Sequence, residues 1–165
     1  GQTDMRRYEA RQLRYHVDTI LKSDAGANVL VVGDLNDSPN SSSINTLMKR
    51  RAGVGKRLYD LRPVDETKAS WTHIWWQADA YSRHDYTLVS FGLLPEVDFE
   101  GCIIPGFPDW STSSDHRPLI TVLHPRNRTD PQVLNHFKRS IFMPPSADAR
   151  EPVAGTRKPQ REDDK

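Results

Sequence analysis

The pattern of apolar and polar positions near the start of the chain has the period of an α-helix. Apolar side chains recur every three to four residues, and arginine, glutamate and other polar residues fill most of the positions between them. This spacing predicts an amphipathic helix over residues 4–22, with Asp4 as its N-cap and the turn that begins at Ser23 as its end. The apolar positions of the helix are Ala10, Leu13, Val17, Ile20 and Leu21.

After this helix the pattern changes to a continuous apolar run, NVLVV, at residues 28–32. A short run of this kind, rich in β-branched residues, is typical of a strand that is covered on both faces. It ends in the polar segment GDLND at residues 33–37. A short amphipathic helix is predicted after that segment, capped by Ser43 and closed near Gly53.

The rest of the chain predicts four further strands, a helix and a tail. The strands are predicted at residues 71–76, 85–90, 97–104 and 117–123, where β-branched and aromatic residues gather. Asp130 followed by a proline predicts the start of a C-terminal helix, and the chain loses most of its apolar residues after it. We therefore expect an α/β (α+β) domain over residues 1–126, a helix over 127–143 and a disordered tail over 144–165.

The composition of the 165 residues, 36% hydrophobic and 27% charged, suits one globular domain. The formal net charge is +1, so any binding to a polyanion requires a local basic patch. The single cysteine, Cys102, excludes a disulfide within the chain and a zinc site built from cysteines. No apolar segment approaches the roughly 20 residues that a membrane-spanning helix needs. None of these properties indicates a cellular location.

The segment GDLND places polar side chains just beyond the carboxyl end of a predicted strand. Functional side chains gather at such ends in α/β sheets, because the chain leaves the sheet there and a crevice can form. Asp34 is a candidate base or metal ligand, and Asn36 is a candidate hydrogen-bond donor. The alternative is a simple turn, since glycine, aspartate and asparagine all favour turns.

The segment RHDY, residues 83–86, opens the strand predicted at 85–90. Asp85 could orient a histidine, because a carboxylate that accepts one ring N–H of an imidazole fixes its tautomer. The alternative is a surface ion pair between Arg83 and Asp85, which would add little stability. His84 alternates away from Asp85 along the strand and is interpreted as a packing or solvent-facing residue.

The segment SDHRPL, residues 114–119, sets a carboxylate, an imidazole and a guanidinium side by side ahead of an apolar strand. Such groups are costly to desolvate unless they are paired or bind something. Asp115 is a candidate ligand for a hard cation, and His116 is a candidate to exchange a proton with a phosphoryl oxygen. Arg117 is expected to pair with a carboxylate or the sheet edge. The alternative is a turn that carries an ion pair.

In their order and combination these three segments resemble the endonuclease/exonuclease/phosphatase superfamily, the deoxyribonuclease-I-like proteins. That family uses GD-x-N, then an R-x-DY-type element, then SDH-x-P, and this chain has GDLND, RHDY and SDHRPL. The strand predicted at 71–76 and the segment YDLRP at 59–63 are also similar to bacterial members, so the likeness runs from about residue 5 to about residue 126. It implies part of a four-layer α/β sandwich with mixed β-sheets flanked by helices.

The resemblance also implies a divalent-metal-dependent hydrolase of phosphodiesters or phosphomonoesters that uses Mg²⁺ or Mn²⁺. On the matching positions, Asp34 would activate or position the attacking water and is a candidate contact for the metal, and Asn36 would hold the scissile phosphate or the nucleophile. Asp85 would orient His116, which would stabilise or protonate the charge that develops on the phosphate. Asp115 would be a metal ligand. The implied partner is a phosphate-ester substrate, with nucleic acid among the candidates.

The family places an N-terminal half with a metal-binding glutamate ahead of these motifs, and no segment of this chain can be assigned to it. We therefore interpret the chain as the C-terminal portion of such a domain and expect activity from the whole domain. One alternative is a catalytically inactive remnant that binds nucleic acid or phosphorylated ligands. Another is a structural domain in which all three motifs are turns.

Two groups of side chains bear on the substrate. A basic cluster could contact nucleic-acid phosphates, although the solvated end of a helix often has the same composition. Three tryptophans could stack on bases, a lipid or a sugar, but their spacing favours core positions, and His73 between them is interpreted as structural. The cluster consists of Lys49, Arg50, Arg51, Lys56 and Arg57, and the tryptophans are Trp71, Trp75 and Trp76.

Overall fold

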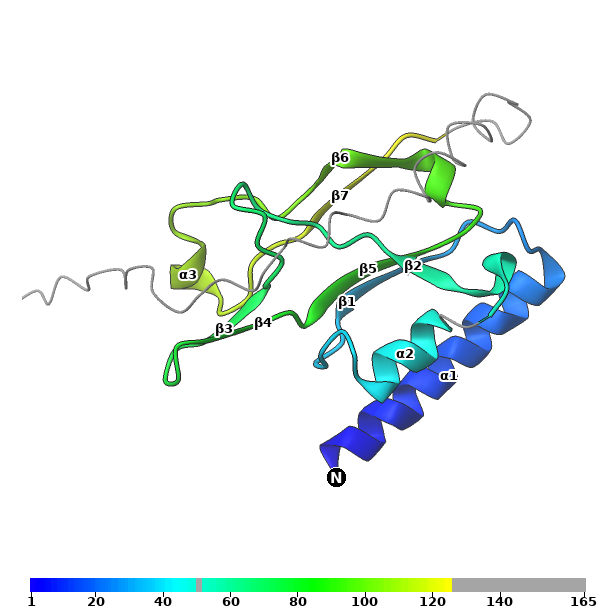
Figure 1. Cartoon of the computed structure of the whole chain (residues 1–165), viewed down its shortest axis with the longest axis horizontal. Coiled ribbons are helices and arrows are strands. Elements are labelled where there is room, and N and C mark those ends of the chain that lie inside the picture. The colour runs from blue at the N-terminus through cyan, green and yellow to red at the C-terminus, as the bar shows by residue number, and fades with distance from the viewer. Residues whose placement is uncertain (50–51, 126–165) are drawn as a thin grey trace, which may run out of the picture.

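The computed structural model describes residues 1–49 and 52–125 as an arrangement of helices and short antiparallel sheets (Figure 1). This mixture makes the fold α+β, as expected, and the four-layer sandwich stays a prediction. None of the helices in the described ranges is long and apolar enough to cross a membrane. In chain order the elements are α1 (Gln2–Ser23), β1 (Leu30–Asp34), α2 (Ser42–Met48), η1 (Val54–Lys56), β2 (Leu58–Asp60), β3 (His73–Trp75), β4 (Ala80–Ser82), β5 (Asp85–Ser90), η2 (Leu94–Glu96), β6 (Val97–Ile103), α3 (Trp110–Ser113) and β7 (Ile120–Leu123).

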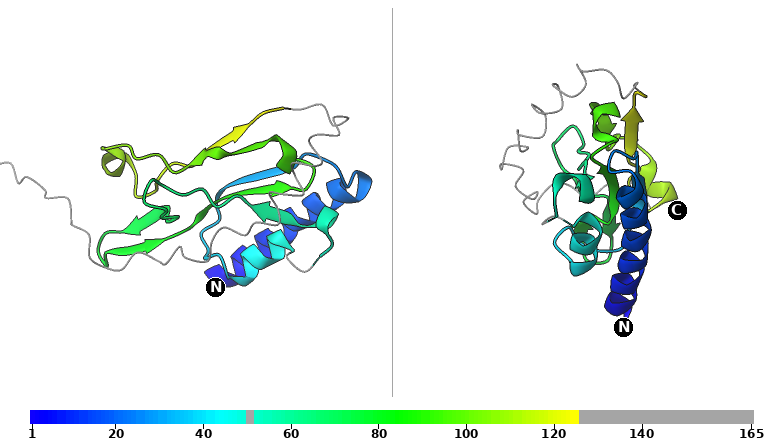
Figure 2. Two further views of the ribbon diagram at one scale, coloured as in Figure 1. Left: turned by 45° about the horizontal axis from the view of Figure 1, so that its top comes forward. Right: turned by 90° about the vertical axis from the view of Figure 1, so that its right-hand side faces the viewer.

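Strand β5 is the centre of the main sheet, with β1 and β2 hydrogen-bonded antiparallel on either side. Its side chains alternate between two apolar cores. Tyr86 and Leu88 pack with apolar side chains of α1 and α2. Val89 packs with a second cluster that includes Leu94 and Leu123. The two helices and the β6–β7 pair therefore lie on opposite faces of the main sheet (Figures 1 and 2).

Helix α1 begins before the residue that the sequence predicts. Gly1 is its N-cap, and Asp4, the predicted cap, is instead the third helical residue. The Asp4 carboxylate lies 3.2 Å from the amino group of Gly1 and accepts a hydrogen bond from it. The cap prediction is therefore wrong by one turn, because an acid at the third helical position can also satisfy the start of a helix. The predicted end of the helix, at Ser23, is confirmed.

Helix α2 is capped by a serine other than the predicted one. Ser41 is the N-cap, and its hydroxyl oxygen accepts the N–H of Ile44 at 3.2 Å. Ser43, the predicted cap, lies inside the helix and donates its hydroxyl to Asp37. The helix also ends before Gly53, because the residue after its last turn already adopts a left-handed conformation.

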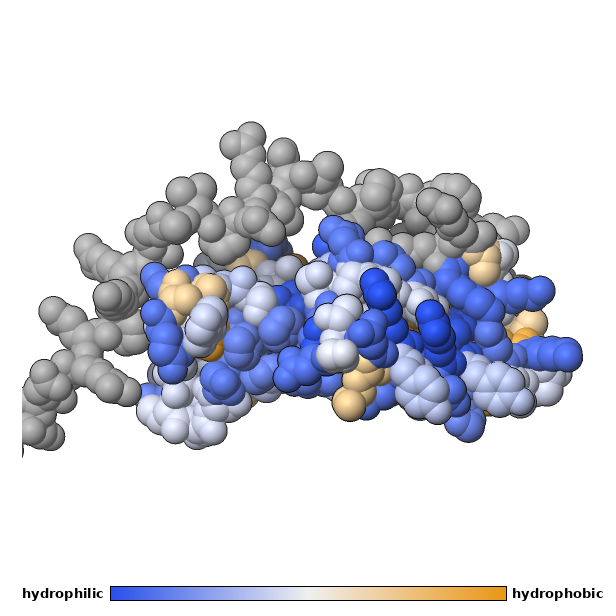
Figure 3. All heavy atoms as spheres, turned by 90° about the horizontal axis from the view of Figure 1, so that it is seen from below, coloured by the Kyte–Doolittle hydropathy of each residue, from blue (hydrophilic) through white to orange (hydrophobic). Residues whose placement is uncertain are grey.

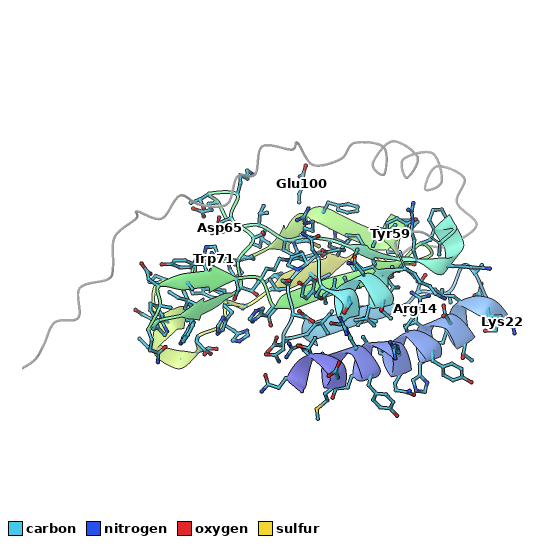
Figure 4. The ribbon with its side chains drawn as sticks, turned by 60° about the horizontal axis from the view of Figure 1, so that its bottom comes forward. Arg14, Lys22, Tyr59, Asp65, Trp71 and Glu100 are labelled. Atoms are coloured by element: carbon cyan, nitrogen blue, oxygen red, sulfur yellow. The ribbon has the colours of Figure 1, made fainter. Side chains whose placement is uncertain are left out.

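Arg14 departs from the amphipathic pattern of α1. The pattern places it among the polar positions, yet it is only 3% exposed. Figure 4 labels Arg14 on the helix. Its guanidinium donates to the carbonyl oxygens of Leu47 and Lys56 at 2.9 and 2.7 Å, and it forms an ion pair with Asp18 at 2.6 Å. Its burial is compensated by these partners, and it ties α1 to α2 and to η1.

One face of strand β1 is exposed, although its apolar run predicts cover on both faces. Leu30 and Val32 are 42% and 59% exposed. Val32 lies opposite Thr87 of β5, which is buried and has its hydroxyl 3.1 Å from that of Thr121 in β7. The β6–β7 layer thus covers β5 but does not reach across to β1. Within the described residues β1 is therefore covered on one face only, as expected of a chain that supplies part of a larger sandwich. An apolar run does not say how far the covering layer extends.

Strands β3 and β4 form a hairpin, and the SDHRPL segment pairs with its edge. The N–H of Arg117 donates to the carbonyl of Thr72 at 2.6 Å. The hydroxyl oxygen of Thr72 accepts the N–H groups of both His84 and Asp85, each at 3.0 Å. One buried threonine therefore connects the hairpin, the SDHRPL segment and the start of β5.

The tryptophans of this hairpin are mostly not core residues. Trp75 and Trp76 are 58% and 46% exposed, and Trp71 is partly buried. Ile74, which is 3% exposed, is the side chain of β3 that points into the core. The ring of Trp110 lies 5.8 Å from that of Trp71. The prediction that most of these tryptophans are core is wrong, because a short hairpin can bury one of its faces and leave the other open.

Two arginines that border the motifs are buried and paired. Arg83 forms a two-point ion pair with Asp60, in place of the surface pair considered from the sequence. Arg117 pairs with Asp65 at 2.8 Å, which confirms the expectation that it finds a carboxylate. Its guanidinium carbon also lies 4.1 Å from the centre of the Trp71 ring, and Figure 4 shows this ring near Asp65. The Arg83–Asp60 and Arg117–Asp65 pairs anchor the RHDY and SDHRPL segments, which carry Asp85 and His116.

Three of the predictions lie outside the described residues. They are the helix at 127–143, the tail at 144–165 and the part of the basic cluster at 50–51.

Candidate active site

Three side chains from the three motifs meet at one end of the main sheet. Asp34 ends β1, and Asp85 begins β5 directly opposite it in the antiparallel register. Residues that face each other in this way present their side chains on the same face of a sheet. His116 comes from the SDHRPL segment. Its Nδ1 lies 2.8 Å from Asp85 Oδ2, and its Nε2 lies 3.9 Å from Asp34 Oδ2.

The GDLND segment is also a tight turn, as its alternative interpretation says. The N–H of Asn36 donates to Asp34 Oδ1 at 2.8 Å, and Asn36 has a positive φ of 50°. Asparagine tolerates this left-handed conformation better than most residues do. The turn and the site are compatible, because the bond to the backbone uses one oxygen of Asp34 and the other faces His116.

The electrostatic surroundings of His116 favour its charged form. Burial alone would lower the pKa of the imidazole. The hydrogen bond to Asp85 and the negative charges of Asp85, Asp34 and Asp115 outweigh burial and raise the pKa of His116 above its usual value. The charged ring has an N–H on each nitrogen, so Nδ1–H can donate to Asp85 while Nε2–H lies on the side of Asp34.

This arrangement predicts a pKa that depends on Asp85. In an NMR titration with a chelator present, His116 should titrate above the value of about 6.5 for a free histidine. The substitution Asp85→Asn should lower that pKa, because it removes both the charge and the ionic hydrogen bond. A folded-state pKa above the unfolded one gives stability that is fully present below pH 6.5 or so and is lost as the pH rises through the folded-state value. An unchanged pKa in Asp85→Asn would contradict this description.

The two other candidates from the sequence lie beside this group. Asn36 is exposed and lines a cleft together with Asp34. The side chain of Asp115 is 59% exposed, and its Oδ2 lies 3.8 Å from Nε2 of His73. Within the described residues, the ligand atoms of Asp34, Asp85 and His116 lie within 4.8 Å of one another, and Asp115 is not part of that group. The structure therefore brings together three of the five candidates.

His73, which the sequence interprets as structural, and His84, which it interprets as packing or solvent-facing, lie beside His116. The rings of His73 and His84 are stacked with their centres 4.9 Å apart, and the centre of the His116 ring is 4.8 Å from that of His73. Nδ1 of His73 is hydrogen-bonded to the hydroxyl of Ser82 at 3.0 Å. Burial, together with the nearby His73, lowers the pKa of His84. Their place in the sequence could have indicated this. His84 directly precedes Asp85, and His73 directly follows Thr72, whose hydroxyl accepts the N–H of Asp85.

The donor set of the site suits a hard divalent cation. Magnesium and manganese prefer carboxylate oxygens, and magnesium is often held by only one or two of them while it keeps several waters. The side chain of Asp34 is 35% exposed, so its free oxygen can take a ligand from solvent. Asp85 is already committed to His116. Asp34 is therefore the residue that fits a cation best.

Family models, curated protein sequences and solved structures were compared with this chain. None of them matches it. The likeness to the endonuclease/exonuclease/phosphatase superfamily therefore depends on the three motifs and stays a prediction.

Proposed function

We propose that the protein is a divalent-metal-dependent phosphoesterase that hydrolyses phosphodiester or phosphomonoester bonds. The observation that carries the proposal is the position of His116 between Asp85 and Asp34, at 2.8 and 3.9 Å. These residues come from three motifs spread over some eighty positions of the chain. An oriented imidazole can supply a proton or stabilise the charge that develops on a phosphate ester, and an accessible carboxylate beside it can position the water or a cation.

Each of these side chains has a distinct role in the proposed reaction. Asp85 holds the imidazole of His116 by its Nδ1–H, so that Nε2 can stabilise or protonate an oxygen of the phosphate. Asp34 positions the attacking water, and the amide of Asn36 holds the scissile phosphate. A bound Mg²⁺ or Mn²⁺ would be held by Asp34 and would supply neutralisation of the phosphate charge. Asp115 is proposed as a further ligand.

The proposal includes the four-layer sandwich and the N-terminal half that the family likeness implies. The exposed face of β1 supports it, because a layer added there would bury Leu30 and Val32. On this proposal the described residues contribute His116 and the carboxylates of Asp34, Asp85 and Asp115, and a glutamate ligand comes from a preceding part of the domain. The coding sequence upstream of Gly1 can be read for a strand that bears a glutamate.

The proposal is tested by assaying the product of the complete reading frame with bis(p-nitrophenyl) phosphate and with a single-stranded oligonucleotide. Hydrolysis should fall at least about a hundredfold when a chelator removes the metal, and Mg²⁺ or Mn²⁺ should restore it. The variant Asp34→Asn should stay inactive after metal is added. Hydrolysis that survives the chelator would overturn the metal-dependent mechanism. Binding of the oligonucleotide without cleavage would favour the inactive remnant.

A further inference from the structure

A second histidine and a second exposed carboxylate face each other beside the candidate active site. Nε2 of His73 and Oδ2 of Asp115 are 3.8 Å apart, which is too far for a hydrogen bond between them. The Asp115 side chain is largely exposed and that of His73 is partly exposed, so a ligand from solvent can reach both atoms. A single hydroxyl oxygen about 2.8 Å from each atom fills this gap, because a hydroxyl both donates and accepts a hydrogen bond.

The imidazole of His73 is held in a fixed orientation. Its Nδ1 is hydrogen-bonded to the hydroxyl of Ser82 at 3.0 Å, and its ring stacks on that of His84 with the centres 4.9 Å apart. The N–H of Ile74 donates to the backbone carbonyl of Asp115 at 3.0 Å, which fixes the backbone on the other side of the gap. Because the carboxylate of Asp115 favours a proton on the nearer ring nitrogen, Nε2 carries an N–H. The gap therefore offers one donor and one acceptor.

The gap is also next to the place proposed for the phosphate. His73 and His116 lie opposite each other in an antiparallel β-bridge, and the centres of their rings are 4.8 Å apart. Residues paired in this way present their side chains on the same face. On the proposed function the phosphate is bound at Nε2 of His116, so the organic group that is esterified to it can extend to His73.

The charges around the gap favour an organic group that is neutral and polar. Asp34 and Asp115 are exposed acids, and a second phosphate or a carboxylate on the ligand would be repelled by them. The arginines of the RHDY and SDHRPL segments, Arg83 and Arg117, are committed to buried ion pairs and cannot offset this repulsion. The face of the molecule that includes α1 is also mainly hydrophilic, with scattered apolar residues (Figure 3). A neutral group that carries hydroxyls therefore fits better than an anionic or an apolar one.

We propose that His73 is a specificity-determining residue, which binds a free hydroxyl group on the organic part of the phosphate ester between its Nε2 and the carboxylate of Asp115. The inference rests on the proposed function, because it places the phosphate at His116. It narrows the substrates to esters of alcohols that carry a further hydroxyl, such as glycerol or a sugar. The hydroxyl uses one oxygen of Asp115 and leaves the other for a cation. His73 contacts the substrate and takes no part in breaking the ester bond.

The test uses the phosphonate analogues of glycerol phosphate and of n-propyl phosphate, in which a CH₂ group replaces the ester oxygen so that hydrolysis is impossible. The two ligands differ only in their hydroxyls, and their dissociation constants are measured by calorimetry with Mg²⁺ present. The hydroxyls should tighten binding to the unsubstituted protein about tenfold, the order expected of a hydrogen bond to a charged group. His73→Phe keeps a ring but no donor and should abolish this gain, whereas His73→Gln should keep part of it. The matched control is His124→Phe, at an exposed histidine that also faces an aspartate.

The results separate the two proposals. If the two analogues bind the unsubstituted protein equally, or if His73→Phe and His124→Phe behave alike, the hydroxyl site is wrong whatever the activity. If His73→Phe weakens both analogues by the same factor, His73 acts on the fold or on the phosphate, and the hydroxyl site is again wrong. If the gain is present and depends on His73, but no phosphate ester is hydrolysed with Mg²⁺ or Mn²⁺, the hydroxyl site holds as a binding site and the proposed hydrolase function fails.

Discussion

Replacing His116 with alanine should reduce phosphodiester hydrolysis by about three to four orders of magnitude, the upper range for loss of a general acid or an electrostatic stabiliser. The imidazole is held at 2.8 Å by Asp85, and its Nε2 is the part of the ring that faces Asp34. An alanine provides neither the proton nor the charge. The loss should appear in kcat, measured with bis(p-nitrophenyl) phosphate at saturating Mg²⁺, because the interaction is made in the transition state.

The fold should survive this substitution. The side chain of His116 is 27% exposed, and its loss opens no large cavity in either core. The matched control is His124→Ala, which removes another histidine–aspartate pair, with Asp98 at 3.2 Å, at the far end of β7. That variant should keep its activity. The free energy of unfolding of His116→Ala is measured by urea unfolding. If this variant is destabilised enough to account for its loss of activity, His116 is a packing residue and the catalytic role is wrong.

Replacing Arg83 with methionine should lower the free energy of unfolding by about 3–5 kcal/mol, the usual cost of leaving one partner of a buried ion pair alone. The side chains of Arg83 and Asp60 are each 5% exposed. Methionine also removes the contact of the guanidinium with the ring of Tyr86, which lies 4.4 Å away. The unpaired Asp60 would then be a buried charge between β2 and β5. Urea unfolding followed by circular dichroism measures the change.

A double substitution distinguishes loss of the pair from loss of packing. Combining Arg83→Met with Asp60→Leu should recover much of the stability, because apolar residues of similar volume can replace a buried pair. Arg7→Met is the control for an exposed arginine, since Arg7 lies 3.8 Å from an exposed aspartate. It should change the free energy of unfolding much less. A double variant that is no more stable than Arg83→Met would show that the charge of Asp60 is not the cause.

The resemblance carried by the order of the three motifs implied that Asp34, Asp85 and His116 meet, and each of these motifs lies at the end of a strand or beside one. The antiparallel pairing of β1 and β5 then brings the carboxyl end of one strand to the amino end of the other. The local pattern of apolar and polar residues could not predict this meeting alone. The pattern indicates on which face of a strand a side chain lies, but it does not indicate which strands are neighbours in the sheet.

The features of the fold and the site that the sequence could not predict depend on which segments lie next to each other in space. Strand alternation interprets His84 as a packing or solvent-facing residue, but its ring lies against that of His73 and 6.5 Å from that of His116. Strands β2 and β4 have three residues each, which is too short for a period of two to be recognised. Arg14 lies on the polar side of the helical pattern and is buried because two backbone carbonyls happen to face it. Each of these features is set by contacts between segments that are distant in the chain.

The two distances around the imidazole of His116 are unequal, and this has a consequence for competition between ligands. The ring and Asp85 are joined by a short ionic hydrogen bond, so the two behave as one unit. Asp34, 3.9 Å from the ring, makes no such bond to it. An incoming cation can therefore bind Asp34 without breaking a hydrogen bond to the ring, whereas at Asp85 it would first have to displace the imidazole.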